Sequence, residues 1–501
     1  MKVAFRGYDF GFGSGLVLVF LQTIGCLLRW IQAFGWIQAF GRVRDVGDTR
    51  HRDWIVLAPA LPVPHNHVHP LSHLRISSRQ RSWRRGIFPG MAPTDGASVT
   101  ASRARLILAI VAWLALLGCV YSIASDPLNQ WDFDVYYSAA RAFVAGQNPY
   151  VPLHPRPDLR GDLIYQYPPL TLLLFRWTAF FSLPVAKLLW LALKLAAIAA
   201  LAWLWHRRFE RLDPRWPTVL FIALAFNATL LRDLTCGNIS TFEELGLWLG
   251  FSLLISDRPY AAAVLLACVA QFKLLPASLL GLIPLVRPRD GWRPFIAGCA
   301  VFLALLAVNF AFSPELAHNY LGLFSDANLR MDDRNLNNPS SLALFRDIVD
   351  STAILPGLSF NRLGGTWAYI FFVITLALLI VRAAWSKREA LRRADPRLLI
   401  YLGCSCYALA MPRMKDYSYI LMLIPALFVV KDMTRRQMAL CYPILAVALA
   451  LSTQPQQTNV PGLSGLITML QAYMPLAFAG GVLAYVLTAL LKDDAAAAPC
   501  R

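Results

Sequence analysis

The chain has 501 residues, of which 57% are hydrophobic and 15% are charged. Soluble globular proteins hold about 45–50% apolar and about 25% charged residues, so this composition excludes an ordinary water-soluble domain. The net charge of +18 is typical of proteins that meet nucleic acid, an anionic membrane surface or an anionic substrate. The mean hydropathy of +0.50 favours a polytopic membrane protein and excludes a nucleic-acid binder.

Residues 1–90 differ in composition from the rest of the chain. They hold twelve Lys and Arg against four acidic residues, five of the eight histidines, and an exact repeat of Trp-Ile-Gln-Ala-Phe-Gly. Neither the histidines nor the nine scattered cysteines have metal-ligand spacing, so no metal site is expected. We expect an atypical basic extension or a mis-assigned start over 1–90, a membrane domain over 91–492 and a short tail over 493–501.

Apolar runs long enough to approach a membrane span recur along the membrane domain, since a transmembrane helix needs about 20 mostly apolar residues. The predicted spans are 104–124, 184–205, 216–233, 239–256, 259–271, 274–286, 295–312, 366–383, 397–412, 417–430, 437–452 and 466–491. The run at 168–182 begins Tyr-Pro-Pro and contains Arg176, which indicates a juxtamembrane helix.

The loops between these runs alternate in charge. One set, which includes 206–215, 287–294 and 382–397, has a several-fold higher density of Lys and Arg than the other. The positive-inside rule places that set in the cytoplasm. The two long loops, 125–183 and 313–365, then face outward, where we expect the functional surface.

A helix is predicted in the first long loop, from Val135 to Ala145, with Gly146 as its stop signal. Asp132 and Asp134 precede it, where an acidic residue commonly caps a helix. Two acids are more than one cap needs. Their apolar and aromatic neighbours suit a general base whose pKa is raised.

Short motifs follow one another over residues 104–490. They are Asp132-x-x-Val-Tyr-Tyr-x-Ala, Gly146-x-x-Pro-Tyr150, Tyr167-Pro-Pro169, Gly237-Asn-Ile-Ser240, Lys273-Leu-Leu-Pro276, Asn338-Pro-Ser-Ser341 and Met411-Pro-Arg-Met-Lys-Asp-Tyr417. In order and spacing they resemble glycosyltransferase family 87, whose members are polytopic bacterial membrane enzymes. The chain departs from the family at Asn238, Ser240 and Met411, where the family tends to have Gln, Asn and Ser.

The resemblance implies an all-α polytopic membrane protein: a GT-C-type bundle of about 11–12 transmembrane helices, with two long outer loops carrying juxtamembrane helices. It implies a hexosyltransferase of the cell (inner) membrane, with mannose as the first expectation. The donor would be a polyprenyl-phosphate sugar and the acceptor a glycolipid or glycan hydroxyl on the extracytoplasmic side. Asp132 matches the family position of the base, and Asp134 is the alternative.

The chemistry of such a transfer needs few groups. The polyprenyl phosphate leaves as an anion and needs cations or hydrogen-bond donors, while the acceptor hydroxyl needs one base. Attack opposite the phosphate inverts the anomeric carbon. No metal or other cofactor is obligatory. The expected phosphate-binding residues are Lys273, Arg413 and Lys415, with Lys273 first because it interrupts an apolar helix.

Further residues of the matched motifs are expected to bind substrate. These are Tyr136, Tyr137, Tyr167, Asn238 and Asn338. The tyrosines can stack on a sugar, although such residues also anchor helices at membrane interfaces.

Two lysines inside the second predicted span need partners of another kind. Lys187 can snorkel outward, whereas Lys194 lies deeper and is expected to pair with Glu243 or Glu244.

A transporter or flippase of lipid-linked sugars is the alternative reading, and a structural partner in an envelope complex is a third. Transporters tend to show two similar halves and broken polar helices at the bilayer midplane. The spans show no such repeat, and the paired carboxylates lie in an outer loop. The sequence therefore favours the enzyme.

Overall fold

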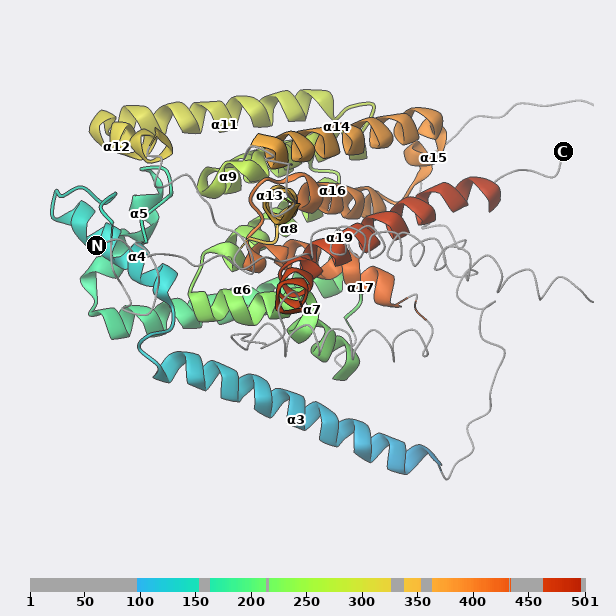
Figure 1. Cartoon of the computed structure of the whole chain (residues 1–501), viewed down its shortest axis with the longest axis horizontal. Coiled ribbons are helices and arrows are strands. Elements are labelled where there is room, and N and C mark those ends of the chain that lie inside the picture. The colour runs from blue at the N-terminus through green and yellow to red at the C-terminus, as the bar shows by residue number, and fades with distance from the viewer. Residues whose placement is uncertain are drawn as a thin grey trace, which may run out of the picture. The chain divides into compact units, whose positions relative to one another are not determined.

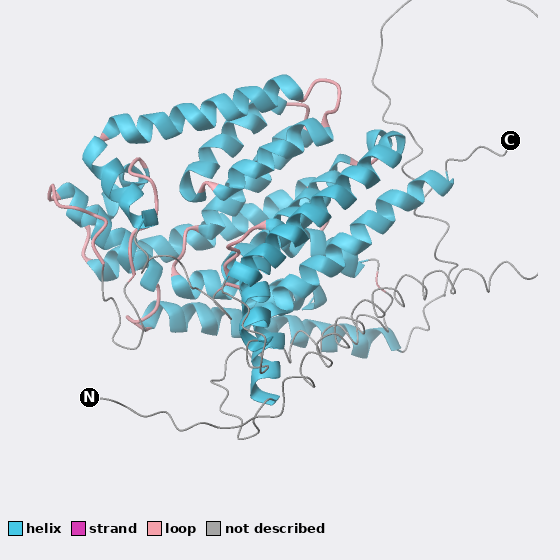
Figure 2. Cartoon of the chain, turned by 45° about the horizontal axis from the view of Figure 1, so that its top comes forward, coloured by secondary structure: helices cyan, strands magenta, loops and turns pink. Residues whose placement is uncertain are grey.

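The structure, a computed structural model, describes residues 97–152, 163–212, 216–325, 338–352, 363–431, 433 and 463–496. All the regular elements in these ranges are helices (Figure 2). The predicted extension 1–90 and the predicted span 437–452 lie outside the described residues. The chain divides into two units, and everything from Ala109 onward in the following description belongs to one of them.

The helices keep the order of the predicted spans. The α-helices are α3 (Ala97–Ser125), α4 (Trp131–Val144), α5 (Thr171–Phe175), α6 (Leu183–Arg208), α7 (Trp216–Cys236), α8 (Ser240–Ile255), α9 (Pro259–Lys273), α10 (Leu282–Val286), α11 (Trp292–Phe312), α12 (Pro314–Ser325), α13 (Ser341–Thr352), α14 (Leu363–Ser386), α15 (Arg388–Arg393), α16 (Pro396–Ala410), α17 (Leu423–Lys431) and α19 (Leu463–Ala496). Three 3₁₀ helices join them: η1 (Arg176–Phe180), η2 (Leu275–Gly281) and η4 (Asp416–Met422).

Four described helices are long and apolar enough to cross a membrane: Leu183–Arg208, Trp292–Phe312, Gly364–Ser386 and Ala472–Leu490. Other predicted spans are shorter helices, such as α9 and α16 with 15 residues each. Their apolar runs end at charged or proline-containing segments, which is why they fall short of the roughly 20 residues of a full span. These helices confirm a multi-pass, all-helical membrane protein.

The helices that carry the site pack in sequence. α11 lies along α9, α9 lies along α8, and α8 lies along α6 (Figure 1). α7 meets η4, so residues about 190 apart along the chain come together. This packing brings the ends of α6, α7, α8 and α9 close to one another.

Two of these helices are broken near the site. In α7, residues 225–228 leave the helical conformation, and Phe226 has a φ of 53°. Between α9 and η2, Leu274 has a φ of 50°, and Pro276 follows it. The predicted pair of short segments at 259–271 and 274–286 is therefore one α-helix followed by η2 and α10. The break leaves Lys273 at the end of α9, where its side chain can turn aside.

Both predicted outer loops carry short helices. α4, α5 and η1 pack together in the first, and α12 and α13 belong to the second. The predicted juxtamembrane helix at 168–182 is the pair α5 and η1. Aromatic rings fill the space beneath α4, including Phe133, Tyr136 and Trp190.

Candidate active site

Asp132 and Asp134 of the first outer loop lie inside α4, not ahead of it. α4 begins at Trp131, so Asp132 and Asp134 occupy its first turn, and the side chain of the N-cap residue, Gln130, makes no capping bond. Gln130, before the helix, has a left-handed φ of 63°, and its N–H donates to the carbonyl of Thr235 over 2.7 Å. The beginning of α4 is therefore tied to the end of α7.

Asp134 forms an ion pair with Lys187 of α6. The Lys187 Nζ lies 2.9 Å from Oδ1 of Asp134, and it also donates to the carbonyls of Pro127 and Asn129 over 2.8 Å each. The two side chains are only 11% and 15% exposed. Lys187 therefore has three acceptors, two carbonyls of the turn before α4 and the carboxylate of Asp134 in α4. Asp134 thus fastens α4 to α6.

Asp132 is held by an amide instead of a cation. The Nδ2 of Asn238 donates to Oδ2 of Asp132 over 2.7 Å. Burial raises the pKa of the Asp132 carboxyl above its ordinary value, although the bond from Asn238 and the charge of Lys415 oppose this rise. A half-buried carboxylate with these properties is suited to accept a proton.

A turn at Gly237 and Asn238 carries this amide to Asp132. Gly237 has a φ of +72°, and a Cβ there would lie 2.8 Å from Cβ of Gln130, so only glycine allows α4 this close. The Nε1 of Trp190 donates to the Gly237 carbonyl over 2.9 Å. The ammonium group of Lys194 donates to the Asn238 carbonyl over 2.6 Å.

Lys194 pairs with Asp233, so the expected pairing with Glu243 or Glu244 is wrong. Its Nζ lies 2.7 Å from Oδ2 of Asp233, and both side chains are fully buried. Hydropathy places Asp233 at the end of a span and carries no information on the rotation of that helix. In the fold, the end of α7 faces α6 at this depth.

Glu243 pairs with Lys273. The Nζ of Lys273 lies 2.6 Å from Oε2 of Glu243 and donates to the Ser240 hydroxyl over 2.6 Å. It also lies 5.4 Å from the centre of the Tyr417 ring, within cation–π distance. The Lys273 side chain remains 23% exposed. A cation that interrupts an apolar helix is thus paired here, yet it stays accessible.

The segment before η4 brings two more cations to the same place. The Nη1 of Arg413 donates to Oε1 of Gln166 over 3.0 Å. The charge of Lys415 acts on the Asp132 carboxyl. Arg232 of α7, with 40% of its side chain exposed, pairs with Asp416 over 2.6 Å and holds this segment against α7.

Asn338 supports that segment. Its Oδ1 accepts the N–H of Met414 over 2.9 Å, and Ser340 donates to the carbonyl of Pro412 over 2.7 Å. The Asn338-Pro-Ser-Ser341 motif therefore lies directly against residues 409–414, and Asn338 is placed next to the two cations.

The predicted substrate-binding tyrosines are mostly buried. The hydroxyls of Tyr136 and Tyr167 lie 2.9 Å apart. Burial raises the pKa of both above the ordinary value, so both stay protonated. Tyr137, one residue further round α4, donates to the carbonyl of Phe181 over 2.9 Å and points towards η1. Tyr136 and Tyr167 therefore lie under the site, and Tyr137 lies away from it.

The structure thus brings most of the predicted site residues together. Asp132, Lys273 and the pair Arg413 and Lys415 come from three places along the chain, and Glu243 adds a second carboxylate. Gln166 and Tyr417 were not predicted, although each lies within or beside a motif that was. With three cations against two carboxylates, this cluster suits an anionic group beside a base. Among the described residues, no group of three or more His, Cys, Asp or Glu side chains could hold a metal ion.

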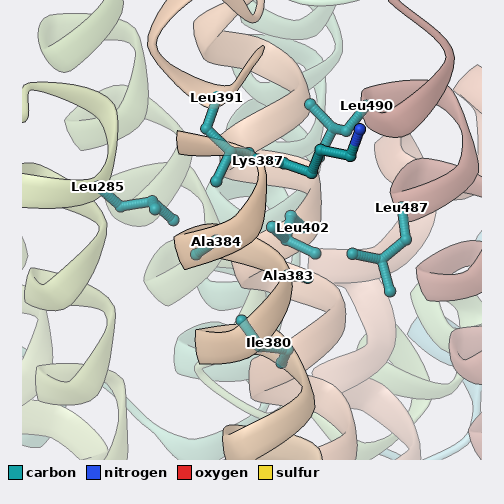
Figure 3. Close-up of a pocket in the computed structure, with 9 residues that line it drawn as sticks. All are labelled: Leu285, Ile380, Ala383, Ala384, Lys387, Leu391, Leu402, Leu487 and Leu490. Atoms are coloured by element: carbon teal, nitrogen blue, oxygen red, sulfur yellow. The ribbon is translucent and has the colours of Figure 1, made fainter. Parts of the chain in front are cut away.

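A pocket lies elsewhere, between α14, α15, α16 and α19 (Figure 3). Its lining is apolar except for Lys387, and none of the predicted site residues borders it. An apolar cleft with one cation lacks the groups that sugar transfer needs, so we place the site at Asp132.

The described helices are those of a multi-pass membrane protein, and comparison with known families indicates a glycosyltransferase. Residues 165–412 match the model of glycosyltransferase family 87. The match agrees with the resemblance in the sequence motifs from Tyr167 onward. The described helices agree with the predicted all-helical fold class.

Two solved structures are similar at low identity. The crystal structure of ArnT from Cupriavidus metallidurans bound to undecaprenyl phosphate has 15% identity and a TM-score of 0.38, with 80% of each chain covered. The apo form has 14% identity and a TM-score of 0.34, covering 77% of this chain and 78% of that one. The search of curated proteins finds no significant match.

Proposed function

We propose that this membrane glycosyltransferase moves a hexose, with mannose as the first candidate, from a polyprenyl-phosphate sugar to an acceptor hydroxyl. The acceptor is a glycolipid or glycan on the extracytoplasmic side of the cell membrane. The transfer inverts the anomeric carbon, and Asp132 is the general base.

One observation carries this proposal: the two acids of α4 have different partners. Asp134 is paired with Lys187, so its carboxylate is already occupied by an ammonium group. Asp132 is bonded to a neutral amide, is half-buried, and has a raised pKa. Of the two, Asp132 is therefore the better base.

The donor phosphate would bind where Lys273, Arg413 and Lys415 converge. Arg413 presents a planar guanidinium that can form two bonds to a phosphate, and Lys273 and Lys415 add point charges. These groups would stabilise the negative charge that develops on the leaving phosphate. The outward orientation rests on the charge difference between the loops.

Asp132→Asn tests the base in proteoliposomes. The donors are polyprenyl phosphates carrying mannose, arabinose, glucose or galactose, the acceptors come from a bacterial membrane lipid extract, and both sugar transfer and released polyprenyl phosphate are measured. Removing a general base costs roughly 10²–10⁴-fold in rate, so Asp132→Asn is expected to lose at least a hundredfold.

Asp134→Asn is the matched control, because it makes the same change two residues away. We expect it to retain transfer within about tenfold and to lower thermal stability, since it removes the charge that pairs with Lys187. Full activity of Asp132→Asn would refute the assignment of the base. Movement of a lipid-linked sugar across a sealed bilayer, with no transfer from any donor, would favour a flippase.

A further inference from the structure

Three hydrogen bonds connect Lys273 of α9 to Asp132 of α4. Lys273 Nζ donates to Ser240 Oγ over 2.6 Å, Ser240 Oγ donates to Asn238 Oδ1 over 2.9 Å, and Asn238 Nδ2 donates to Asp132 Oδ2 over 2.7 Å. The two intermediate side chains are buried, Asn238 with 3% and Ser240 with 0% of its surface exposed. We call these four residues the Lys273–Asp132 relay.

The direction of every bond in the relay is determined by groups that can only donate. The ammonium group of Lys273 has no acceptor, so the Ser240 oxygen must accept and its proton must point elsewhere. The backbone N–H of Ser240 donates to Asn238 Oδ1 over 3.1 Å, which fixes the orientation of that amide. The Nδ2 of Asn238 is thereby turned to Asp132, where it stabilises the ionised carboxylate.

The backbone around Asn238 is fixed independently. Lys194 donates to the Asn238 carbonyl, and Trp190 donates to the neighbouring Gly237 carbonyl. These bonds restrict the Asn238 backbone and so favour the hydrogen bond between its side chain and Asp132. Bonds aligned in one direction polarise one another, so a cation at one end strengthens the donation at the other.

We propose that Asn238 and Ser240 are positioning residues that aim the ionised Asp132 carboxylate and link it to the ammonium group of Lys273. The inference rests on the proposed role of Asp132 as base. Through the relay, the positive charge of Lys273 strengthens the hydrogen bond that Asn238 donates to the base. Neither residue needs to touch the substrate for this role.

Other charged groups near Asp132 also influence the pKa of its carboxyl. Lys194 from α6, Asp233 from α7 and Lys415 ahead of η4 act on its carboxyl. Its charge also acts on Tyr136, Tyr167, Cys236 and Tyr417. None of these groups is altered by a substitution at Ser240, so such a substitution isolates the relay.

The test is the pH dependence of transfer by the full-length protein in proteoliposomes, with polyprenyl-phosphate mannose as donor. Because the base works when ionised, the rate rises with pH through the pKa of Asp132. Asn238→Leu removes a hydrogen bond to the charged form, which raises that pKa. We expect the rising limb to move up by roughly one pH unit, and the rate below it to fall about tenfold.

Ser240→Ala removes the bond from Lys273 and the hydroxyl bond to Asn238 Oδ1 but leaves the bond from Asn238 to Asp132, so a smaller upward shift is expected. Ser240→Thr restores the hydroxyl and the wild-type profile. Ser252→Ala is the matched control, a buried serine of the same helix outside the relay. The kcat is expected to change more than the donor KM, and rates well above the limb should match wild type.

Two outcomes would overturn the relay. One is a Ser240→Ala profile with an unmoved limb, as in Ser252→Ala. The other is a loss of equal size at every pH, which indicates a purely structural role. Activity of Asp132→Asn would instead refute the proposed function itself. If Asp132→Asn is inactive and the limb stays in place, only the relay fails.

Discussion

The buried ion pair between Lys194 and Asp233 gives the sharpest prediction for stability. Both side chains are fully buried, with Nζ and Oδ2 2.7 Å apart, so removing one partner leaves an uncompensated charge. We expect Lys194→Met to destabilise the protein by about 3–5 kcal/mol.

The double variant Lys194→Met/Asp233→Leu should be more stable than Lys194→Met alone. Replacing a buried ion pair with apolar residues is often neutral, because the desolvation cost of both charges disappears. The recovery is incomplete here, since Lys194 also bonds the carbonyls of Asp233 and Asn238, and each lost bond costs about 1–3 kcal/mol.

Thermal unfolding in detergent, followed by tryptophan fluorescence and by the monodisperse fraction on size exclusion, measures the four corners of this cycle. We expect the rate of sugar transfer by the double variant to stay below that of the wild type, because the turn at Asn238 has lost the hydrogen bond from Lys194. A double variant no more stable than Lys194→Met would refute the reasoning, since the destabilisation would then come from lost packing and not from a stranded carboxylate.

Three further changes probe the surroundings of the site. Gly237→Ala would place a Cβ 2.8 Å from that of Gln130 at a φ of +72°, so we expect a loss of about 1–3 kcal/mol in thermal unfolding and a fall in kcat. Tyr136→Phe deletes the 2.9 Å bond to Tyr167 and should cost about 1 kcal/mol in the same unfolding assay, with kcat almost unchanged. Arg413→Gln should lower kcat/KM for the donor at least tenfold in steady-state transfer assays, because it weakens both binding of the phosphate and stabilisation of the charge that develops on it. A kcat/KM that does not move would remove Arg413 from the phosphate site.

The motifs, through the family that they resemble, predict which residues of the site lie together. Asp132, Asn238, Lys273 and residues 413–415 come from separate motifs, and the fold places them in one cluster. The helical fold class could be predicted from hydropathy, because the length of each apolar run can be counted directly in the sequence.

The pairing of charges could not be predicted in the same way. Lys194 faces Asp233 and not Glu243 because helix rotation, and not depth alone, decides which side chains meet. Lys187 forms an ion pair with Asp134 because the turn at Gln130 places α4 against α6. Neither rotation nor a left-handed turn residue leaves a clear signal in hydropathy. The helix breaks at Leu274, and this break lets Lys273 reach Ser240. In the sequence, only Pro276 indicates it.

The distribution of the ion pairs along the chain also bears on biosynthesis. The Lys187–Asp134 and Lys194–Asp233 pairs join residues 53 and 39 positions apart, whereas the Arg232–Asp416 pair spans 184. At about 5–20 residues per second, a ribosome needs roughly 15 to 60 s to proceed from Asp132 to Lys415. During that interval the early helices can enter the membrane with their charges already neutralised by near neighbours. Two of the three cations of the site, Arg413 and Lys415, are added last, so a chain that stalls before Arg413 holds the base but only one of the phosphate-binding cations.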